Sequence, residues 1–409
     1  MKKQQFDFDC LIVGGGLVGA GLARALRDQP IKIGVIEAVP TNADVQPSYD
    51  DRGLGVAPAS QRILQGIGLW DDLKTETTPI KNIHITDRGH FGATRISAEK
   101  LGVEQLGHIV IGRALGEVLQ KSVTTAANTE FICPASISSV ENHPDHIKIE
   151  IKEKDNTRTV TTRLLIAADG GFSQVREMLG VETETKEYNQ TAIVTNVSPE
   201  ISHYNTAFER FTSTGPLALL PSSDQRCVVV WTTKTDQANE IMQLDEEEFL
   251  RQLGKRFGHR LGKFVKMGQR RSYPMRLIKA KKLVGSRFAI LGNAAHTIHP
   301  NAAQGLNLGL RDVAQMAELI VDATRNDKDI ASPELLERYA ESRTRDHQQV
   351  IRFSDGLTKL FYNDNPFLIT FRNLAMLGID RFPPAKRALS KRAMGLAGEP
   401  PRLVRGLPL

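Results

Sequence analysis

The sequence predicts an α/β fold with a Rossmann-like dinucleotide-binding domain, a smaller sheet-based domain and a C-terminal helical tail. Three observations support this prediction. The chain opens on a strand, a glycine-rich turn and a helix, its composition becomes strand-rich at about residue 187, and a basic tail with helical apolar spacing closes it. At 409 residues it is too long for one minimal core, so two domains are expected.

The first motif spans residues 10–37 and reads as strand, glycine turn, helix, strand and acid. Gly14, Gly16 and Gly19 form G-x-G-x-x-G. The first glycine permits a sharp turn, the second lets backbone N–H groups approach a pyrophosphate, and the third lets helix and strand pack closely. Glu37 follows where a carboxylate can accept hydrogen bonds from ribose hydroxyls. The motif predicts a dinucleotide site, with a structural turn as the alternative, and does not distinguish FAD from NAD.

Composition narrows the class of protein. The net charge of +6 and the pI of about 9.1 favour an anionic partner such as a phosphate cofactor, a nucleic acid or a lipid surface, without choosing among them. The three cysteines are far apart and form no C-x-x-C, so we expect neither a disulfide framework nor a zinc site. Because no apolar signal region opens the chain and no stretch nears 18 apolar residues, we expect a cytoplasmic protein without a membrane span.

Two arginines and one acidic corner are further candidates. Arg52 follows the dinucleotide unit on a loop and is either a phosphate or flavin contact or a surface side chain. Arg113 starts a helix, where a cation is disfavoured unless it meets an anion, so it is either a ligand contact or part of a salt bridge. Asp169-Gly170 ends an apolar strand that starts at residue 164, a ligand-facing corner common in α/β folds. Ahead of it, residues 131–163 suggest a small antiparallel sheet.

The strand-rich region, residues 187–279, predicts a second domain in which a helix covers a sheet. Alternation within residues 207–212 is imperfect, but it predicts Phe208 and Arg210 on one face of a strand. The other face would then hold Ala207, Glu209 and Phe211. Asp245 precedes an apolar stripe and has a glutamate three positions on, which predicts the start of the covering helix.

A third motif, residues 287–324, repeats the order strand, loop and helix. Backbone N–H groups at the start of its helix, residues 305–307, can point at an anion or a carbonyl. His296 and His299 lie three apart in the loop. A metal would need a third ligand, and the chain has no H-x-x-x-H or H-E-x-x-H helix, so we expect a packed or hydrogen-bonded pair and no metal.

The C-terminal part predicts helices. A long helix is expected to start at Ser332-Pro333 and to run to about Phe361. In the arginine- and lysine-rich tail, apolar residues recur at helical spacing, which suggests either an amphipathic helix on an anionic membrane or a solvated surface helix. These apolar residues are Ala388, Leu389, Ala393 and Leu396.

The predicted boundaries are 1–78, 100–186 and 280–345 for the nucleotide domain, 187–279 with part of 79–99 for the second domain, and 346–409 for the helical region.

Together the three motifs resemble those of the group A flavin-dependent aromatic hydroxylases, which have a p-hydroxybenzoate-hydroxylase-like FAD-binding domain. The match is closer to the ubiquinone-biosynthesis hydroxylases, whose GNAAHTxHP…QGxNLGxRD pattern appears at residues 292–300 and 304–312. Two departures from the family pattern are Asn293, where the wider family has Asp, and Asn301-Ala302-Ala303, where this branch has Ile-Ala-Gly. The segments that most resemble enzymes hydroxylating 2-octaprenyl-6-methoxyphenol are residues 86–90, 208–212, 215–221 and 260–263.

The resemblance implies that the chain binds FAD and that NADH or NADPH docks transiently to reduce it. It implies that O2 adds to the flavin as a C4a-hydroperoxide, which hydroxylates the phenol ring of a polyprenylated ubiquinone precursor such as 2-polyprenyl-6-methoxyphenol. It assigns Arg52 and Pro300 to the reaction site, and the N–H groups of Leu306 and Asn307 to the flavin edge. No residue stands out as the base that deprotonates the phenol.

The motifs and the resemblance together define the predicted site. The cofactor-binding residues are Gly14, Gly16, Leu17, Val18, Gly19, Glu37, Arg52, Arg113, Asp169, Gly170, Gly292, Asn293, Pro300, Gln304, Gly305, Leu306 and Asn307. The substrate pocket is expected beside Phe208, Arg210, Leu217, Leu219 and Pro221.

Other functions share some of these features. A flavin halogenase has the same fold but carries W-x-W-x-I-P, whereas Trp70 and Trp231 are far apart here. A hydroxylase of a soluble aromatic acid and a non-catalytic flavoprotein subunit of a biosynthetic complex stay open. The expected partners are a polyprenyl phenol lipid and O2, with a ubiquinone-biosynthesis complex and the periphery of the inner membrane as further candidates. We expect no nucleic-acid partner.

Overall fold

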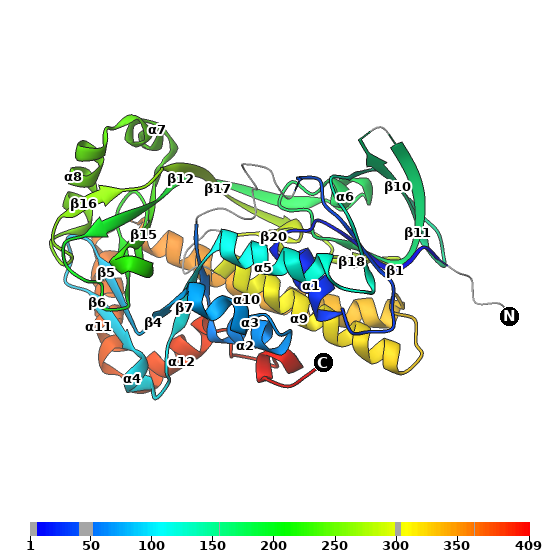
Figure 1. The fold of residues 1–409 in the computed structure, drawn as a ribbon. Coiled ribbons are helices and arrows are strands. Elements are labelled where there is room, and N and C mark those ends of the chain that lie inside the picture. The colour runs from blue at the N-terminus through cyan, green and yellow to red at the C-terminus, as the bar shows by residue number, and fades with distance from the viewer. Residues whose placement is uncertain (1–5, 41–51, 155, 299–303, 364) are drawn as a thin grey trace.

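The computed structural model describes residues 6–40, 52–154, 156–298, 304–363 and 365–409. Two large sheets lie toward opposite ends of the molecule, and the long helices α9 (Gln304–Arg325) and α10 (Pro333–Phe361) run along it between them (Figure 1). The chain builds most of the first sheet, crosses to the second, returns to complete the first and ends in helices. The predicted α/β class, with a sheet-based second unit and a helical tail, is confirmed.

The first sheet has eight strands, and five of them are parallel in the order β19-β11-β1-β2-β8. The central strands are almost continuously apolar and buried, as is typical of parallel sheets. Because these strands are parallel, the chain leaves β1, β11 and β19 at one edge, where the three sequence motifs begin. The strands are β1 Phe8–Val13, β2 Ile33–Ile36, β8 Thr129–Ile132, β9 Ser136–Asn142, β10 Ile147–Glu153, β11 Asn156–Ala167, β18 Val284–Gly285 and β19 Phe288–Ile290.

The antiparallel sheet expected over residues 131–163 is only partly correct. Its first predicted strand belongs to β8, which pairs in parallel with β2. The predicted strand from residue 164 continues the preceding one as the single strand β11, which pairs with β10 in its first half and with β1 in its second. No turn residues interrupt β11, so the apolar half of the strand follows directly from the polar half.

The second sheet has the strand order β20-β17-β12-β15-β14-β13-β5-β6, with β16 on the side of β12. Residues 79–99 supply β5 and β6, and β12 runs through the predicted domain boundary at residue 187. The strands are β5 Asn82–Asp87, β6 Ala93–Ser97, β12 Thr183–Pro199, β13 Thr206–Phe211, β14 Leu217–Pro221, β15 Cys227–Lys234, β16 Phe264–Met267, β17 Arg271–Ala280 and β20 His296–Thr297.

The two faces of the second sheet have different surroundings. Helices α7 (Thr235–Gln243) and α8 (Glu246–Phe257) cover one face, which we call the outer face, and form a buried apolar core with it. The Asp245 side chain accepts a hydrogen bond from the Glu248 N–H at 2.8 Å, which confirms the predicted start of α8. The other face, the inner face, is turned toward the three-stranded sheet β3-β7-β4, since a Cβ on Gly53 would lie 2.6 Å from Val228.

The remaining elements complete the helical layer and the small sheet. Helix α10 starts as predicted, with the Ser332 side chain accepting a hydrogen bond from the Leu335 N–H. The elements are α1 Leu17–Ala25, β3 Gly53–Val56, α2 Pro58–Gly66, α3 Trp70–Leu73, η1 Lys74–Glu76, β4 Thr77–Ile80, α4 Ala98–Leu101, β7 Gly107–Ile111, α5 Gly112–Thr124, α6 Gln174–Met178, η2 Ser223–Gln225, η3 Gly292–Ala294, α11 Pro366–Arg381, α12 Pro383–Ala393 and η5 Arg402–Arg405.

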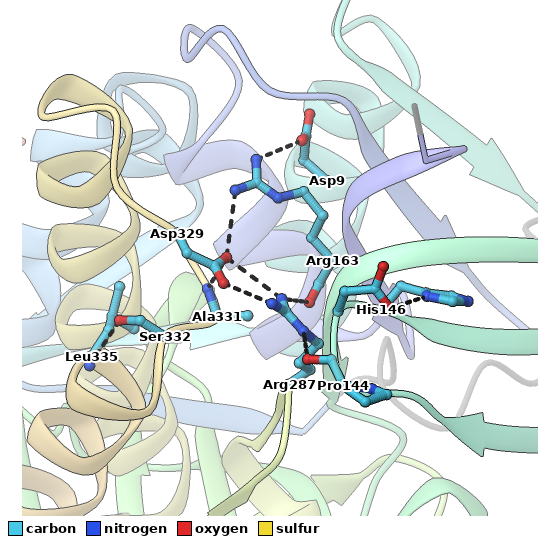
Figure 2. A network of polar contacts seen from close by, with 10 residues as sticks. Asp9, Pro144, His146, Arg163, Arg287, Asp329, Ala331, Ser332 and Leu335 are labelled. Atoms are coloured by element: carbon cyan, nitrogen blue, oxygen red, sulfur yellow. Dashed lines mark hydrogen bonds and ion pairs between the residues drawn. The ribbon is translucent and has the colours of Figure 1, made fainter. Parts of the chain in front are cut away.

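A polar network ties the far end of the first sheet to the loop between α9 and α10 (Figure 2). Asp329 accepts hydrogen bonds from Arg287 at 2.7 Å and from Arg163 at 3.4 Å. Arg163 also contacts Asp9 at the start of β1. These groups are partly exposed, and exposed ion pairs add little to the free energy of folding. The network therefore mainly sets the position of the first sheet relative to the loop between α9 and α10.

Candidate functional site

The glycine turn of the first motif lies directly against the second motif. Gly14 has φ +104°, and a Cβ there would lie 2.4 Å from the Ala168 carbonyl oxygen. At Gly19 a Cβ would lie 1.9 Å from the Gly14 carbonyl oxygen. Only glycine fits at these two positions, because any larger residue would require the backbone to shift.

The start of α1 is open to a ligand as the motif requires. Gly16 is its N-cap and brings no side chain to cap the first turn. Leu17, Val18 and the next residue are therefore among the N–H groups that lack an intrahelical acceptor. The Glu37 carboxylate lies at this turn, where it accepts hydrogen bonds at 2.8 Å from the Gly15 and Val39 N–H groups. The structure thus brings Glu37 to the glycine turn, and its contact with a ribose stays a prediction.

The second motif supports the same edge. The Asp169 carboxylate accepts hydrogen bonds from the Ser173 hydroxyl and from the Val175 N–H, and Ser173 caps α6. Burial raises the pKa of Asp169 above its usual value, and these hydrogen bonds oppose that rise. Gly170 follows with φ +88°. Arg176 then joins the second motif to the third, because it donates to the Ala294 carbonyl at 2.8 Å.

The third motif meets both the first motif and the small sheet. A Cβ on Gly292 would lie 2.8 Å from the Val18 side chain, and Gly292 has φ +59°. The Asn307 side chain accepts a hydrogen bond from the Ala57 N–H and donates one to the Gly55 carbonyl, each at 2.8 Å. Asn293 is exposed in the intervening turn. Gln304, Gly305 and Leu306 form the first turn of α9, next to Asn307.

The two candidate arginines have different surroundings. The Arg52 guanidinium lies 4.7 Å from the ring centre of Tyr273, on β17 of the second sheet, so it sits between the two sheets. Arg113, in the first turn of α5, forms an exposed pair with Glu117 at 3.3 Å. The salt bridge that was one alternative for Arg113 is therefore present, and its contact with a ligand stays a prediction. Pro300, His299 and residues 301–303 lie outside the described residues, so their predicted roles rest on the sequence.

A buried network missed by sequence reasoning anchors the third motif. Asp312 of α9 accepts hydrogen bonds from the Gly292 N–H at 3.0 Å and from Arg343 at 2.7 Å, and its carboxylate lies 2.9 Å from His296 Nε2 and 2.8 Å from His347 Nε2. Burial alone would raise the pKa of Asp312, but the charge of Arg343 and the hydrogen bond from His296 hold it well below its usual value.

The three groups His296, Asp312 and His347 are close enough to one another to share a metal ion. The Arg343 guanidinium occupies one Asp312 oxygen, however, and would repel a cation. Burial lowers the pKa of His347 to about 4, so its ring is neutral and can donate to Asp312. Hydrogen bonding accounts for this network. The predicted pairing of His296 with His299 is not tested, because His299 lies outside the described residues. In the sequence, the feature that could have indicated this network was the pair Arg311-Asp312 at the end of the QGxNLGxRD pattern.

The predicted pocket residues lie on the outer face of the second sheet. The rings of Phe208 and Phe257 of α8 are edge-on, with their centres 5.4 Å apart. Leu217 and Leu219 are fully buried in the same core. Arg210 donates a hydrogen bond to the Phe257 carbonyl. Pro221 is buried at the end of β14. The structure therefore places four of these residues around α8, with Pro221 buried farther along the same strand as Leu219, so the pocket role of all five stays an untested prediction.

The inner face of the second sheet is where the nucleotide motifs and the sheet meet. Val194, Glu209 and Val230 are partly exposed on it, although each lies within a strand in the body of the sheet. Glu209 was placed on the face opposite Phe208 from alternation, but no chemical role was assigned to it. Burial raises the pKa of Glu209 to about 7. The inner face is thus mostly apolar and incompletely covered around Glu209, while its other carboxyl group, that of Asp87, is paired with Arg372.

FAD fits these residues on the geometry of the edge. The glycine turn leaves no room for side chains between β1 and β11, and α1 and α9 both begin there with N–H groups suited to phosphate and to the electron-rich part of a flavin. Arg52 and Asn307 then mark a path from the glycine turn to the inner face of the second sheet.

Comparison with known families matches residues 7–354 to the family described as "FAD binding domain". The chain is 38% identical to ubiquinone hydroxylase UbiL of Rhodospirillum rubrum, over 98% of this chain and 93% of that protein. It is 30% identical to 3-demethoxyubiquinol 3-hydroxylase of Escherichia coli, over 94% and 98% respectively. The solved structure of p-nitrophenol 4-monooxygenase PnpA of Pseudomonas putida has a TM-score of 0.79 at 18% identity, covering 96% of this chain and 98% of that one, which shows the fold.

These matches extend over nearly the whole chain rather than over one motif. They agree with the convergence of the three motifs at one sheet edge, and they account for the FAD cofactor and its nicotinamide reductant. The chain therefore belongs to the FAD binding domain family, in the branch of the ubiquinone hydroxylases, and is an FAD-dependent aromatic monooxygenase.

Proposed function

We propose that this enzyme hydroxylates the phenol ring of a polyprenylated ubiquinone precursor, 2-polyprenyl-6-methoxyphenol, with O2 and NADH or NADPH. The observation that carries the proposal is the meeting of all three motifs beside an apolar, partly exposed sheet face. The names of the two relatives, both hydroxylases of ubiquinones or their precursors, support the substrate class. FAD supplies the oxygen activation that a phenol ring cannot achieve alone.

The chain's own residues would position the reactants. The N–H groups of Leu306 and Asn307, at the start of α9, would stabilise negative charge on the reduced ring, and each such donor is worth about 3 kcal/mol when it resembles an oxyanion-hole donor. Arg52 would place its charge beside the ring, held in position by Tyr273. Pro300 would border the site of oxygen addition.

Turnover with isotopically labelled O2 tests the reaction. Purified protein with FAD and NADPH or NADH is expected to transfer one 18O atom to 2-polyprenyl-6-methoxyphenol, and to do so faster with a tailed than with an untailed phenol. Equal or greater activity on an untailed aromatic acid would instead favour the soluble substrate. Reduced nicotinamide oxidation without hydroxylated product would favour a non-catalytic flavoprotein role. Lipid analysis of a strain lacking the protein would name the accumulated precursor.

We also propose that helix α11 brings the enzyme to the lipid bilayer where a polyprenylated substrate resides. The outward side of α11 carries Phe367, Phe371 and Leu374, which are 86%, 64% and 57% exposed and recur at helical spacing. Arg381 and Phe382 are exposed at the end of this helix. An apolar strip beside basic side chains fits an anionic bilayer. Among the described helices, none combines the length and apolar character needed to cross a membrane.

We favour this surface over the stripe predicted within residues 385–396. Leu389 on α12 is only partly exposed, and Leu396, which follows the end of α12 at Ala393, packs against the main core. The surface of the tail is also less positively charged than its sequence suggests, because Arg372 is buried and donates a hydrogen bond to Asp87 at 2.8 Å.

The bilayer contact can be tested without touching the reaction site. Phe367→Ser with Phe371→Ser is expected to lower binding to liposomes containing anionic lipid at low salt, while FAD content stays unchanged. The matched control is Phe172→Ser, since Phe172 is 73% exposed on another part of the chain. Liposome binding that is equal in the double variant and the wild type would contradict the role of α11.

A further inference from the structure

We propose that Glu209 takes the proton from the phenol hydroxyl of the substrate, an inference that rests on the proposed hydroxylation of a phenol. The sequence offered no candidate for this base. Two carboxyl groups lie on the sheet face that the nucleotide motifs approach, those of Glu209 and Asp87, and Asp87 is paired with Arg372. Glu209 is the one without a charged partner, and the residues around it are mostly apolar.

Strand register defines the surroundings of Glu209. Across the sheet, Glu209 of β13 pairs with Ala218 of β14, Ala218 with Val230 of β15, and Val230 with Val194 of β12. Directly paired residues project to the same face, so these four side chains form one row. The small Ala218 leaves space beside Glu209, and the partial exposure of its neighbours shows that the protein does not fill this space completely.

The row lies close to the residues assigned to FAD. Ala192, two residues from Val194 and on the same face, pairs with Tyr273, whose ring contacts Arg52. On the other side of the row, Val228 meets Gly53 of β3, the strand that Asn307 holds through Gly55. A ring seated on this row would therefore lie between the reaction-site arginine and the carboxyl group of Glu209.

The charge environment suits a proton acceptor near neutral pH. Within the described part of the chain, the Glu209 carboxyl group has no side-chain hydrogen bond or ion pair, and burial raises its pKa to about 7. Burial and the charge of Glu209 raise the pKa of Tyr362, at the end of α10. Asp87, on the neighbouring strand β5, is neutralised by Arg372 at 2.8 Å. A base is most effective when its pKa lies near the working pH.

The proposed step is a single proton transfer. The phenol O–H bond breaks, its proton forms a bond to a carboxylate oxygen of Glu209, and the electron pair stays on the phenol oxygen. The resulting phenolate is a more electron-rich ring and attacks an electrophilic oxygen more readily than the neutral phenol. The proton returns to solvent after turnover, so no additional oxidant or reductant is needed.

Glu209→Gln removes the base and keeps the shape of the side chain. The rate of phenol hydroxylation at pH 8 is expected to fall about 100-fold, the size typical of one general base, with FAD content unchanged. The rise in rate of the wild type as pH passes through about 7 should disappear in the variant. Glu240→Gln is the matched control, because Glu240 is exposed on α7 of the same unit.

A more acidic phenol separates a base from a structural residue. An analogue that carries a nitro group is already ionised at pH 8, so Glu209→Gln should hydroxylate it nearly as well as the wild type. A variant that is equally slow on both phenols would contradict the inference, as would one that keeps the wild-type rate and pH profile on the parent phenol. If the wild type gives no hydroxylated product, the proposed function fails and takes this inference with it.

Discussion

The outer and inner faces of the second sheet come from the same strands but serve different ends. On the outer face, Phe208, Leu219 and Trp231 are buried beneath α8 in a dry apolar core. One residue away along the same strands, Glu209 and Val230 are partly exposed on the inner face. Because successive side chains alternate between faces, a strand can contribute to stability with one set of residues and to chemistry with the other. A carboxyl group without a charged partner is tolerated better on the face that is not fully packed.

The largest contrast is expected between adjacent leucines of β14. Leu219→Ala deletes a fully buried side chain on the outer face and should lower the free energy of unfolding by about 2–5 kcal/mol. Leu220→Ala removes a partly exposed side chain from the inner face and should cost less than half as much. Urea denaturation of the two variants measures both values. Equal losses would show that the two faces are packed alike.

A bulky residue on the inner face should impair binding more than folding. Val230→Phe is expected to weaken binding of a short-tailed phenol at least tenfold, or about 1.4 kcal/mol, by occupying the space in the Glu209 row. Its free energy of unfolding should change by less than the roughly 1–3 kcal/mol typical of overpacking a filled core. Calorimetric titration of the phenol measures binding, and urea denaturation measures the free energy of unfolding. A large loss of stability with little change in binding would show that the inner face is already filled.

Glu209→Gln should change how the stability of the folded protein depends on pH. Burial raises the pKa of Glu209 from 4.5 to about 7, so the folded protein binds the proton more tightly than the unfolded chain does. The wild type therefore loses stability as pH rises from about 4.5 to 7, and the variant should not. The melting temperature of the variant relative to wild type is expected to be higher at pH 8 than at pH 4.5. A pH-independent difference would contradict the raised pKa.

The smallest effect on folding is expected on α11, a third kind of surface. Phe371→Ser removes an exposed apolar side chain and should change the free energy of unfolding by no more than about 0.5 kcal/mol. Thermal unfolding is a sufficient measurement. A loss of several kcal/mol would mean that this side of α11 is covered in the folded protein and does not face a bilayer.

Local sequence patterns predicted much of the nucleotide site. The order strand, glycine turn, helix and acid fixed Gly14, Gly19 and Glu37 because each satisfies a steric or hydrogen-bonding need within about 30 residues. The first turn of α9 was predicted for the same reason. The parallel strands then bring the motifs to one edge.

The parts that were missed depend on distant contacts. Alternation separated Phe208 from Glu209 but did not show which face α8 covers. Asp312 meets Arg343 and His347 only because α9 and α10 pack side by side. On α11 both sides are rich in apolar residues, so the sequence did not show that Phe367 and Phe371 face outward.

A crystal structure with FAD and a short-tailed 2-prenyl-6-methoxyphenol would test the central claim most directly. The claim predicts the phenol ring against Val194, Ala218 and Val230 on the inner face, with its hydroxyl oxygen within hydrogen-bonding distance of Glu209 and the flavin beside Arg52. A phenol bound on the outer face, for example in the cavity of about 300 Å³ lined by Arg88, Trp231 and Arg256, would contradict it.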